Sequence, residues 1–184
     1  KLKQKKNTDR IMKIMQNRSS SFIECAMDYA DAGFYEDAVK TLQLCTKEDP
    51  MLVYYAAAYA AHYDKKYSEK LLKTAASKDP KYCFPDRLED IAVLKYAIEN
   101  NSEDSYAPYY LGCLLYDKKQ YEDAVAFWKK SASLNDTYPT VLRNLSLAYF
   151  NKKDDKVRAR KLMEKAFRLD DSDARIFQEL DQLY

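Results

Sequence analysis

Hydrophobic side chains between residues 106 and 136 recur every three or four positions, the spacing of one face of an α-helix. A polar segment, Asp117 to Gln120, separates two such runs. This arrangement predicts two antiparallel amphipathic helices joined by a tight turn. Gly112 and Ala124 are expected to let the two backbones approach closely. The positions that carry the pattern are Tyr109, Leu111, Gly112 and Leu115, then Tyr121, Ala124, Val125, Trp128, Ser131 and Ala132.

A second copy of this pattern lies between residues 19 and 50. Ser19 to Ser21 supply an N-cap, and Gly33 suits the left-handed exit from a first helix. Asp49-Pro50 is expected to end the second helix. The positions that carry this copy are Phe22, Cys25, Ala26 and Tyr29, then Tyr35, Ala38, Leu42 and Cys45.

The remaining stretches follow the pattern less regularly. Residues 51–80 form a shortened copy whose second helix is expected to restart at Tyr67, with Lys70 where a small residue would pack better. Residues 81–104 predict one helix, Asp86 to Glu99, after an extended segment that ends at Pro85. Residues 139–173 predict another helix pair with a long loop from Asn151 to Lys156, and residues 174–184 predict a last helix.

These spacings resemble the tetratricopeptide repeat (TPR), a helix pair of about 34 residues. Leu111-Gly112, Tyr121, Ala124 and Trp128 stand where that family has its signature residues, although Pro108 replaces the preferred Trp. The resemblance implies an all-α fold, a TPR-like right-handed superhelix of antiparallel helix pairs. The expected segments of this single array are a basic leading helix (1–18), a repeat (19–52), a shortened repeat (53–80), an irregular single helix (81–104), two repeats (105–138 and 139–173) and a half repeat or capping helix (174–184).

The C-terminal half also resembles a narrower group. The runs are RLEDIAVLKYAIENNSEDSYAPYYLGCLLYDKKQYEDAVAFWKKS, YPTVLRNLSLAYFNK and ARIFQELDQLY. They are similar to the helical part of large bacterial proteins that join a β-rich domain of unknown function to TPR helices, often linked with carbohydrate metabolism. This resemblance implies a β-rich domain ahead of Lys1 and no known active site in the present residues.

Composition agrees with helices and offers little for catalysis. The 184 residues include only two glycines and five prolines, and no alternating run rich in Val, Ile and Thr predicts a strand. The four cysteines form no CxxC pair, so we expect small buried side chains rather than a metal site or disulfides. The single histidine, His62, is expected at a turn. We therefore expect no enzyme, no cofactor and no metal site.

The net charge of +2 is unevenly distributed. Residues 1–18 hold seven basic side chains against Asp9, and residues 151–168 hold eight against three acidic ones. For both segments we expect a solvated helix face. Binding of nucleic acid is the alternative, although nucleic acid is not the partner that we expect.

TPR arrays generally bind peptides on the concave face that the first helix of each repeat builds. Tyr and Arg are good anchors there because they combine a large rigid area with a polar tip. The alternative is that these side chains pack on the neighbouring repeat or on a missing domain. A clamp for a ligand's C-terminal carboxylate is not expected, since Ile23 and Met27 stand where it needs Lys and Asn. The expected contacts are Tyr106, Tyr109, Tyr110, Cys113, Tyr116, Arg143, Asn144, Leu147 and Phe150.

The sequence thus favours a non-catalytic scaffold for protein–protein or domain–domain interaction. The expected partner is a protein, a peptide or an adjacent domain of the same chain. No apolar run approaches the roughly 18 residues that span a bilayer, and no signal-peptide core is present, so we expect a cytoplasmic protein without membrane contact. The alternative function is a helical accessory region of a carbohydrate-active protein whose β-rich domain is absent from these residues.

Overall fold

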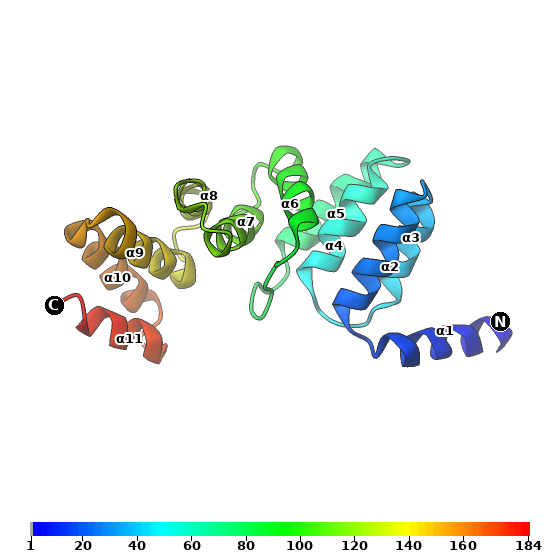
Figure 1. Ribbon diagram of the computed structural model, residues 1–184, viewed down its shortest axis with the longest axis horizontal. Helices are drawn as coiled ribbons and strands as arrows, with labels where there is room; N and C mark the ends of the chain where they lie inside the picture. Colours follow the sequence, from blue (N-terminus) through cyan, green and yellow to red (C-terminus); the bar gives the residue numbers. More distant parts are fainter. Residues whose placement is uncertain (1) are drawn as a thin grey trace. The chain divides into compact units, whose positions relative to one another are not determined.

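The structure is a computed structural model that describes the backbone of residues 2–184 and the side chains of residues 9–184. Regular structure within the described residues consists of eleven α-helices and no strand (Figure 1). Four of the lysines of the predicted basic arm, Lys1, Lys3, Lys5 and Lys6, lie outside the described side chains. The helices are α1 (Leu2–Met15), α2 (Ser19–Asp31), α3 (Tyr35–Leu44), α4 (Pro50–Ala60), α5 (Lys65–Ala76), α6 (Leu88–Asn100), α7 (Tyr106–Asp117), α8 (Tyr121–Leu134), α9 (Pro139–Lys153), α10 (Lys156–Leu169) and α11 (Ala174–Asp181).

The chain divides into two compact units. Unit 1 comprises Lys1–Cys83 and Tyr96–Ser102, and unit 2 comprises Phe84–Lys95 and Glu103–Tyr184. Within unit 1, α2 packs on α3, α3 on α4, and α4 on α5. Within unit 2, α7 packs on α8, α8 on α9, α9 on α10, and α10 on α11. Each unit is therefore a stack of sequence-adjacent antiparallel helices, as predicted.

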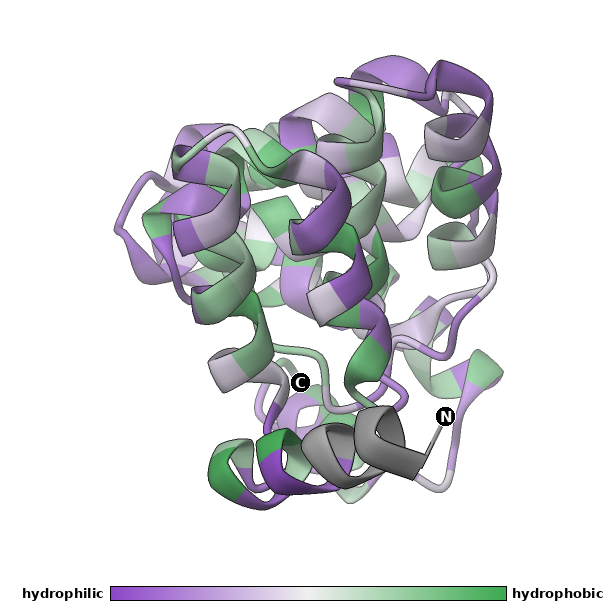
Figure 2. Ribbon diagram, turned by 90° about the vertical axis from the view of Figure 1, so that its right-hand side faces the viewer, coloured by the Kyte–Doolittle hydropathy of each residue, from purple (hydrophilic) through white to green (hydrophobic). Residues whose placement is uncertain are grey.

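The buried side chains of unit 1 recur at helical spacing on each element, so that hydrophobic residues return on successive turns (Figure 2). Phe22 and Ala26 of α2 and Ala38 of α3 are completely buried. The helix α4 is buried on several sides, and Tyr54 and Tyr55 lie wholly inside. Burial of such large rings contributes to the hydrophobic stabilisation of this unit.

The core of unit 2 is centred on a contact between Gly112 of α7 and Trp128 of α8. A Cβ atom placed on Gly112 would lie 2.6 Å from Nε1 of Trp128, far inside van der Waals contact. The indole N–H donates a hydrogen bond to the carbonyl of Tyr109 at 3.2 Å. The glycine thus makes room for an indole ring, whereas the sequence suggested a close approach of two backbones.

Turns and caps explain several helix ends. Gly33 adopts a φ of +82°, as predicted for the exit from α2. Pro50 begins α4 and does not end α3, which stops at Leu44, because the Asp49 side chain accepts from the N–H of Met51 and caps α4. The expected helix from Asp86 instead begins at Leu88, since the Asp90 carboxylate holds the N–H groups of Asp86 and Arg87 in a preceding turn.

The helix α5 is shifted in register from the expectation. It begins at Lys65, with Asp64 as its cap, rather than at Tyr67. Ser68 therefore occupies the buried place that a small residue needs, and its hydroxyl donates to the carbonyl of Ala57 at 2.7 Å. Lys70 faces solvent, so it does not loosen the helix pair.

The loop expected from Asn151 to Lys156 is mostly helix. The helix α9 continues to Lys153 and ends where Asp154 takes a left-handed conformation with a φ of +49°. Asp155 then caps α10 by accepting from the N–H of Arg158 at 2.9 Å. Asp residues tolerate both roles, so a two-residue connection suffices.

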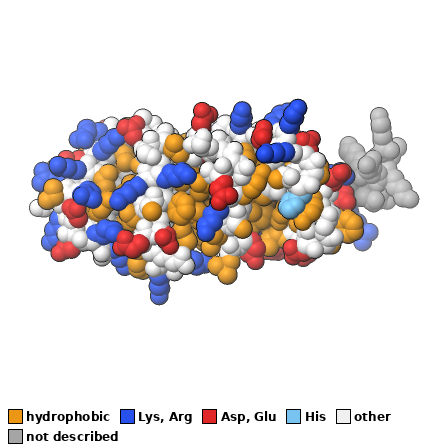
Figure 3. Space-filling model, turned by 90° about the horizontal axis from the view of Figure 1, so that it is seen from above, with side chains coloured by type: hydrophobic (Ala, Val, Ile, Leu, Met, Phe, Trp, Pro, Cys, Tyr) orange, Lys and Arg blue, Asp and Glu red, His pale blue; other side chains and the backbone are white. Residues whose placement is uncertain are grey.

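The surface carries both signs of charge with apolar side chains between them (Figure 3). No helix within the described residues is both long and apolar enough to cross a lipid bilayer.

Candidate functional site

Eight of the nine expected contact residues follow one stripe along α7 and one along α9, both in unit 2. We call this set the α7/α9 face, and it consists of Tyr106, Tyr109, Cys113 and Tyr116 with Arg143, Asn144, Leu147 and Phe150. Tyr110, the ninth, departs from the expectation. Its side chain is completely buried and projects about 100° away from that of Tyr109, which belongs to the stripe but is also buried.

The two stripes meet at their centre. The side-chain amide of Asn144 donates to the sulfur of Cys113 at 3.6 Å. Burial raises the pKa of the Cys113 thiol to about 11, although hydrogen bonds from Trp128, Tyr109 and Asn144 oppose that rise. The thiol is therefore protonated at neutral pH and serves as a small packing group rather than a nucleophile.

A cluster of three tyrosines covers the start of the face. The ring of Tyr138, just before α9, meets the rings of Tyr106 and Tyr109 edge-on, with centroids 5.4 and 5.0 Å apart. Burial raises the pKa of Tyr109, which is only 8% exposed. These rings join α7 to the residue that precedes α9. Tyr138 was missed as a site residue, and its place before Pro139 gave no signal beyond a helix start.

Arg143 is engaged by the last helix. Its guanidinium donates to both carboxylate oxygens of Glu179 on α11, with 2.7 Å between Nε and Oε2. Both side chains are largely buried, at 17% and 20% exposure. Next to this pair, Arg175 lowers the pKa of Asp173, the cap of α11, to about 2. Arg143 therefore holds α11 in place, and a ligand would have to compete with a bidentate partner.

The end of the face remains open. Tyr116 lies one turn beyond Cys113 on α7, and Leu147 lies one turn beyond Asn144 on α9. The ring of Tyr116 rests on Tyr121 and Trp128, with centroids 4.9 and 5.2 Å away. Leu147 is half-buried and Phe150 is exposed. Three large side chains thus offer apolar area to solvent on rigid helices.

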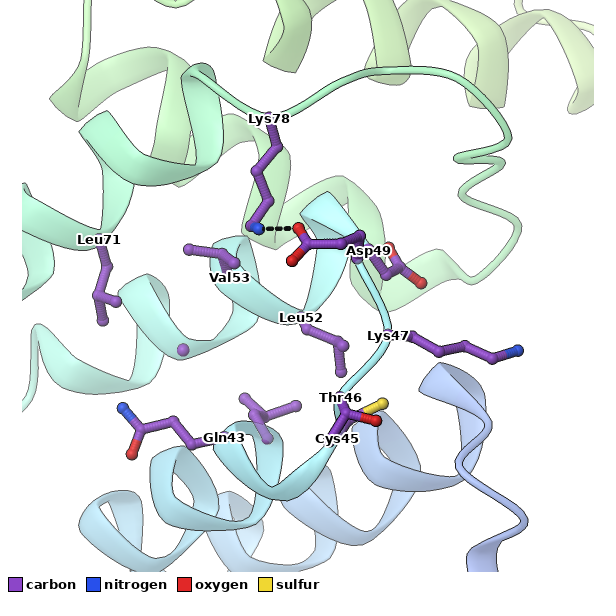
Figure 4. Close-up of a pocket in the computed structure, with 12 residues that line it drawn as sticks. Gln43, Cys45, Thr46, Lys47, Asp49, Leu52, Val53, Leu71 and Lys78 are labelled. Atoms are coloured by element: carbon purple, nitrogen blue, oxygen red, sulfur yellow. Dashed lines mark hydrogen bonds and ion pairs between the residues drawn. The ribbon is translucent and has the colours of Figure 1, made fainter.

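Unit 1 contains a separate hollow of about 270 Å³ between α3, α4 and α5 (Figure 4). Leu52 and Val53 of α4 and Leu71 of α5 point into it. A hydrogen bond of 2.5 Å from Gln43 to Tyr67 joins α3 to α5, and an ion pair between Lys78 and Glu48 closes the other end. Its lining mixes apolar and polar residues, with two lysines, Glu48 and Asp49 among the polar ones, so it offers shape but no particular chemistry.

Comparison with solved structures finds other helical repeat proteins. A double mutant of MamA from RS-1 matches with a TM-score of 0.50 at 19% identity, over 90% of this chain and 82% of that chain. PilF of Pseudomonas aeruginosa matches with a TM-score of 0.49 at 19% identity, over 90% and 67%. YrrB, described as a TPR protein with an unusual peptide-binding site, matches with a TM-score of 0.48 at 14% identity, over 95% and 80%. No protein-family model matches the chain. The all-α fold of antiparallel helix pairs is TPR-like, as the sequence predicted.

Proposed function

We propose that the chain is a non-catalytic interaction scaffold and that the open end of the α7/α9 face binds a protein segment. The observation that carries this proposal is the exposure of Phe150, one turn beyond Leu147 on α9, where Asn144 of the same helix contacts Cys113 of α7. Large apolar and aromatic side chains on a rigid platform are the usual anchors of protein interfaces.

The polar groups of the face support binding rather than chemistry. The Cys113 thiol, with its pKa near 11, is a poor nucleophile at neutral pH. The Arg143–Glu179 pair is bidentate and is occupied with joining α9 to α11. Neither arrangement combines a nucleophile with a base that could activate it.

The test is selection of binders from a library of random peptides displayed on phage, with the purified chain as target. The selected peptides are then measured against Phe150→Glu, which places a charge at the proposed anchor. The matched control is Phe34→Glu, because Phe34 is an exposed phenylalanine of unit 1. We expect Phe150→Glu to weaken binding at least about tenfold, which corresponds to losing one good anchor, and Phe34→Glu to leave it unchanged.

Two results would contradict this function. One is a selection that yields no peptide above background, or only peptides that bind both variants equally. The other is turnover of a glycan substrate by the chain alone, which would favour an enzymatic role instead.

A further inference from the structure

The basic segment at the C-terminal end of the chain is only partly neutralised. The helix α10 carries six basic residues and one acidic residue. Arg158 pairs with Asp155, Arg160 with Glu164, and Lys165 with Asp136, at 3.4, 2.8 and 2.7 Å. Lys156 and Lys161 form no ion pair with any side chain that the structure describes. Two exposed cations, one on each side of the stripe that carries Val157 and Arg160, are thus left for a partner.

These two lysines border a groove in the surface. Lys156, Val157, Arg160, Lys161 and Glu164 of α10 line it together with Leu183, which follows α11, and its volume is about 420 Å³. Val157 is one of its lining residues and is 70% exposed. An aliphatic side chain that exposed among cations gives the groove an apolar strip with a positively charged border.

The far end of the groove is held rigid. The guanidinium of Arg160 stacks on the ring of Tyr184, 4.3 Å from its centroid. Glu164 accepts hydrogen bonds from both Arg160 and the Tyr184 hydroxyl, each at 2.8 Å. These contacts join α10 to the residues after α11, so the groove does not need to assemble when a partner arrives.

The charges at the start of α10 oppose the helix dipole. The second and third residues of α3 and α8 are Glu and Asp, which suit the positive N-terminal end of a helix. The corresponding residues of α10 are Val157 and Arg158, and Lys156 precedes them. Positive side chains there are unfavourable for the helix dipole, and Asp155, which caps α10 and pairs with Arg158, offsets part of that cost.

We propose that the groove of α10 binds an acidic amphipathic segment of a partner protein. Carboxylates of the segment pair with Lys156 and Lys161, and an apolar side chain covers Val157 and Leu183. Nucleic acid fits less well, because a phosphate backbone gains nothing from the apolar strip. In the space-filling view, Lys and Arg side chains lie over the part of unit 2 that carries α9 and α10, with Asp and Glu side chains among them (Figure 3).

The experiment uses fluorescence anisotropy at low ionic strength with a labelled synthetic helix of Glu and Leu. The same peptide with Gln in place of Glu and an oligouridylate are the two comparison probes. We expect the chain to bind the Glu peptide, with affinity falling as salt rises, and to bind the Gln peptide much more weakly. Equal binding of the Glu and Gln peptides would overturn the proposal, and so would no binding of the Glu peptide at low salt.

Variants locate the binding on α10. Lys156→Glu with Lys161→Glu is expected to weaken binding of the Glu peptide about tenfold or more. Lys119→Glu with Lys130→Glu changes the net charge of unit 2 equally and is expected to have less than about a twofold effect. Val157→Ser tests the apolar strip and is expected to weaken binding severalfold without affecting the far-ultraviolet circular dichroism spectrum.

Two outcomes would contradict the assignment. Equal losses in the two double-lysine variants would mean that only the overall charge of the unit matters. Binding of the oligouridylate that is lost in Lys156→Glu with Lys161→Glu, in a chain that does not bind the Glu peptide, would identify the groove as a nucleic-acid surface. Neither outcome bears on Phe150, so the α7/α9 face is tested separately.

Discussion

The hairpins α2–α3 and α7–α8 begin their second helices with the same five residues, Tyr-Glu-Asp-Ala-Val, at Tyr35–Val39 and Tyr121–Val125. In both hairpins the Ala and Val are buried and the two acidic residues face solvent. The next inward position differs, since α3 has Leu42 and α8 has Trp128. At the corresponding place in the first helix, Ala26 in α2 is replaced by Gly112 in α7.

This difference shows that a close-packed core constrains the volume of a pair rather than of each residue. An indole is larger than an isobutyl group, and the facing residue has lost its Cβ in compensation. The tryptophan also gains a polar contact, because its N–H donates to the carbonyl of Tyr109. The two hairpins therefore share a polar pattern but differ in the residue pair at the middle of their helix contact, which is Ala26 with Leu42 in one and Gly112 with Trp128 in the other.

The turns of the two hairpins have the same backbone geometry although their residues differ. The N–H of Phe34 bonds to the carbonyl of Tyr29 at 2.8 Å, and the N–H of Gln120 bonds to the carbonyl of Leu115 at 2.9 Å. The residue before each donor is left-handed, and it is Gly33 with φ +82° in one turn and Lys119 with φ +63° in the other. Only glycine adopts this conformation without a steric cost.

The largest expected effect follows from filling the space over Gly112. Gly112→Leu forces a side chain into the position of the Trp128 indole and should destabilise the chain by roughly 1–3 kcal/mol through overpacking. Urea denaturation followed by circular dichroism measures the change. Ala126→Leu is the control, because Ala126 is an exposed position on α8 and should change stability little. An unchanged midpoint for Gly112→Leu would mean that the contact is misplaced.

A double-mutant cycle tests whether the Gly112 and Trp128 pair of the second hairpin can be replaced by the Ala and Leu pair of the first. Gly112→Ala alone should overpack, and Trp128→Leu alone should leave a cavity and break the bond to Tyr109. The double variant recreates the Ala and Leu pair of the first hairpin, so the two losses should not add. We expect a coupling free energy of about 1–2 kcal/mol from denaturation of the four proteins. Strict additivity would contradict compensation of volume.

The turn comparison predicts a gain in stability. Lys119→Gly should stabilise the second hairpin by about 0.5–1 kcal/mol, because it relieves the left-handed conformation of a residue with a side chain. Gly33→Lys should destabilise the first hairpin by a similar amount, since nothing in that turn favours a side chain at a φ of +82°. Thermal denaturation measures both, and a loss in Lys119→Gly would show that the lysine makes a compensating contact.

The smallest effect concerns the thiol of α7, which has Met27 as its counterpart in α2. The pKa of Cys113 is raised to about 11 in the folded chain, above its usual value, so the folded state keeps the proton longer than the unfolded state. Because the folded state binds this proton more tightly, the free energy of unfolding does not change with this group below about pH 9. It falls as the pH rises from about 9 to 11.

Labelling with iodoacetamide and peptide mass spectrometry measures this thiol directly. At pH 8 we expect Cys113 to react much more slowly in the folded chain than in urea, and to approach the unfolded rate only near pH 11. Equal rates in the folded and unfolded chains at pH 8 would contradict the burial of the thiol.

The sequence by itself determined the number and kind of elements in the two hairpins that share Tyr-Glu-Asp-Ala-Val. Spacing of apolar residues sets which face of a helix is buried, and this is a local property of the chain. Element boundaries were predicted less well. Asp49, Asp90 and Asp155 shift helix starts by capping backbone N–H groups, and sequence alone does not show which of several nearby Asp residues does so.

Only the tertiary structure decided which residues of the candidate site are engaged by other side chains and which remain exposed. The spacing of residues predicted that Tyr106, Tyr109, Tyr110, Cys113 and Tyr116 share one side of the helix, but it did not predict the side chains that they contact. These contacts depend on side chains that are far apart in the sequence. Tyr138 packs on two of the tyrosines, and Glu179 binds the guanidinium of Arg143. Lys156 and Lys161, which line the groove of α10, remain unpaired among the described side chains. Periodicity specifies which way a residue faces, whereas the neighbour that it meets depends on how separate helices pack in three dimensions.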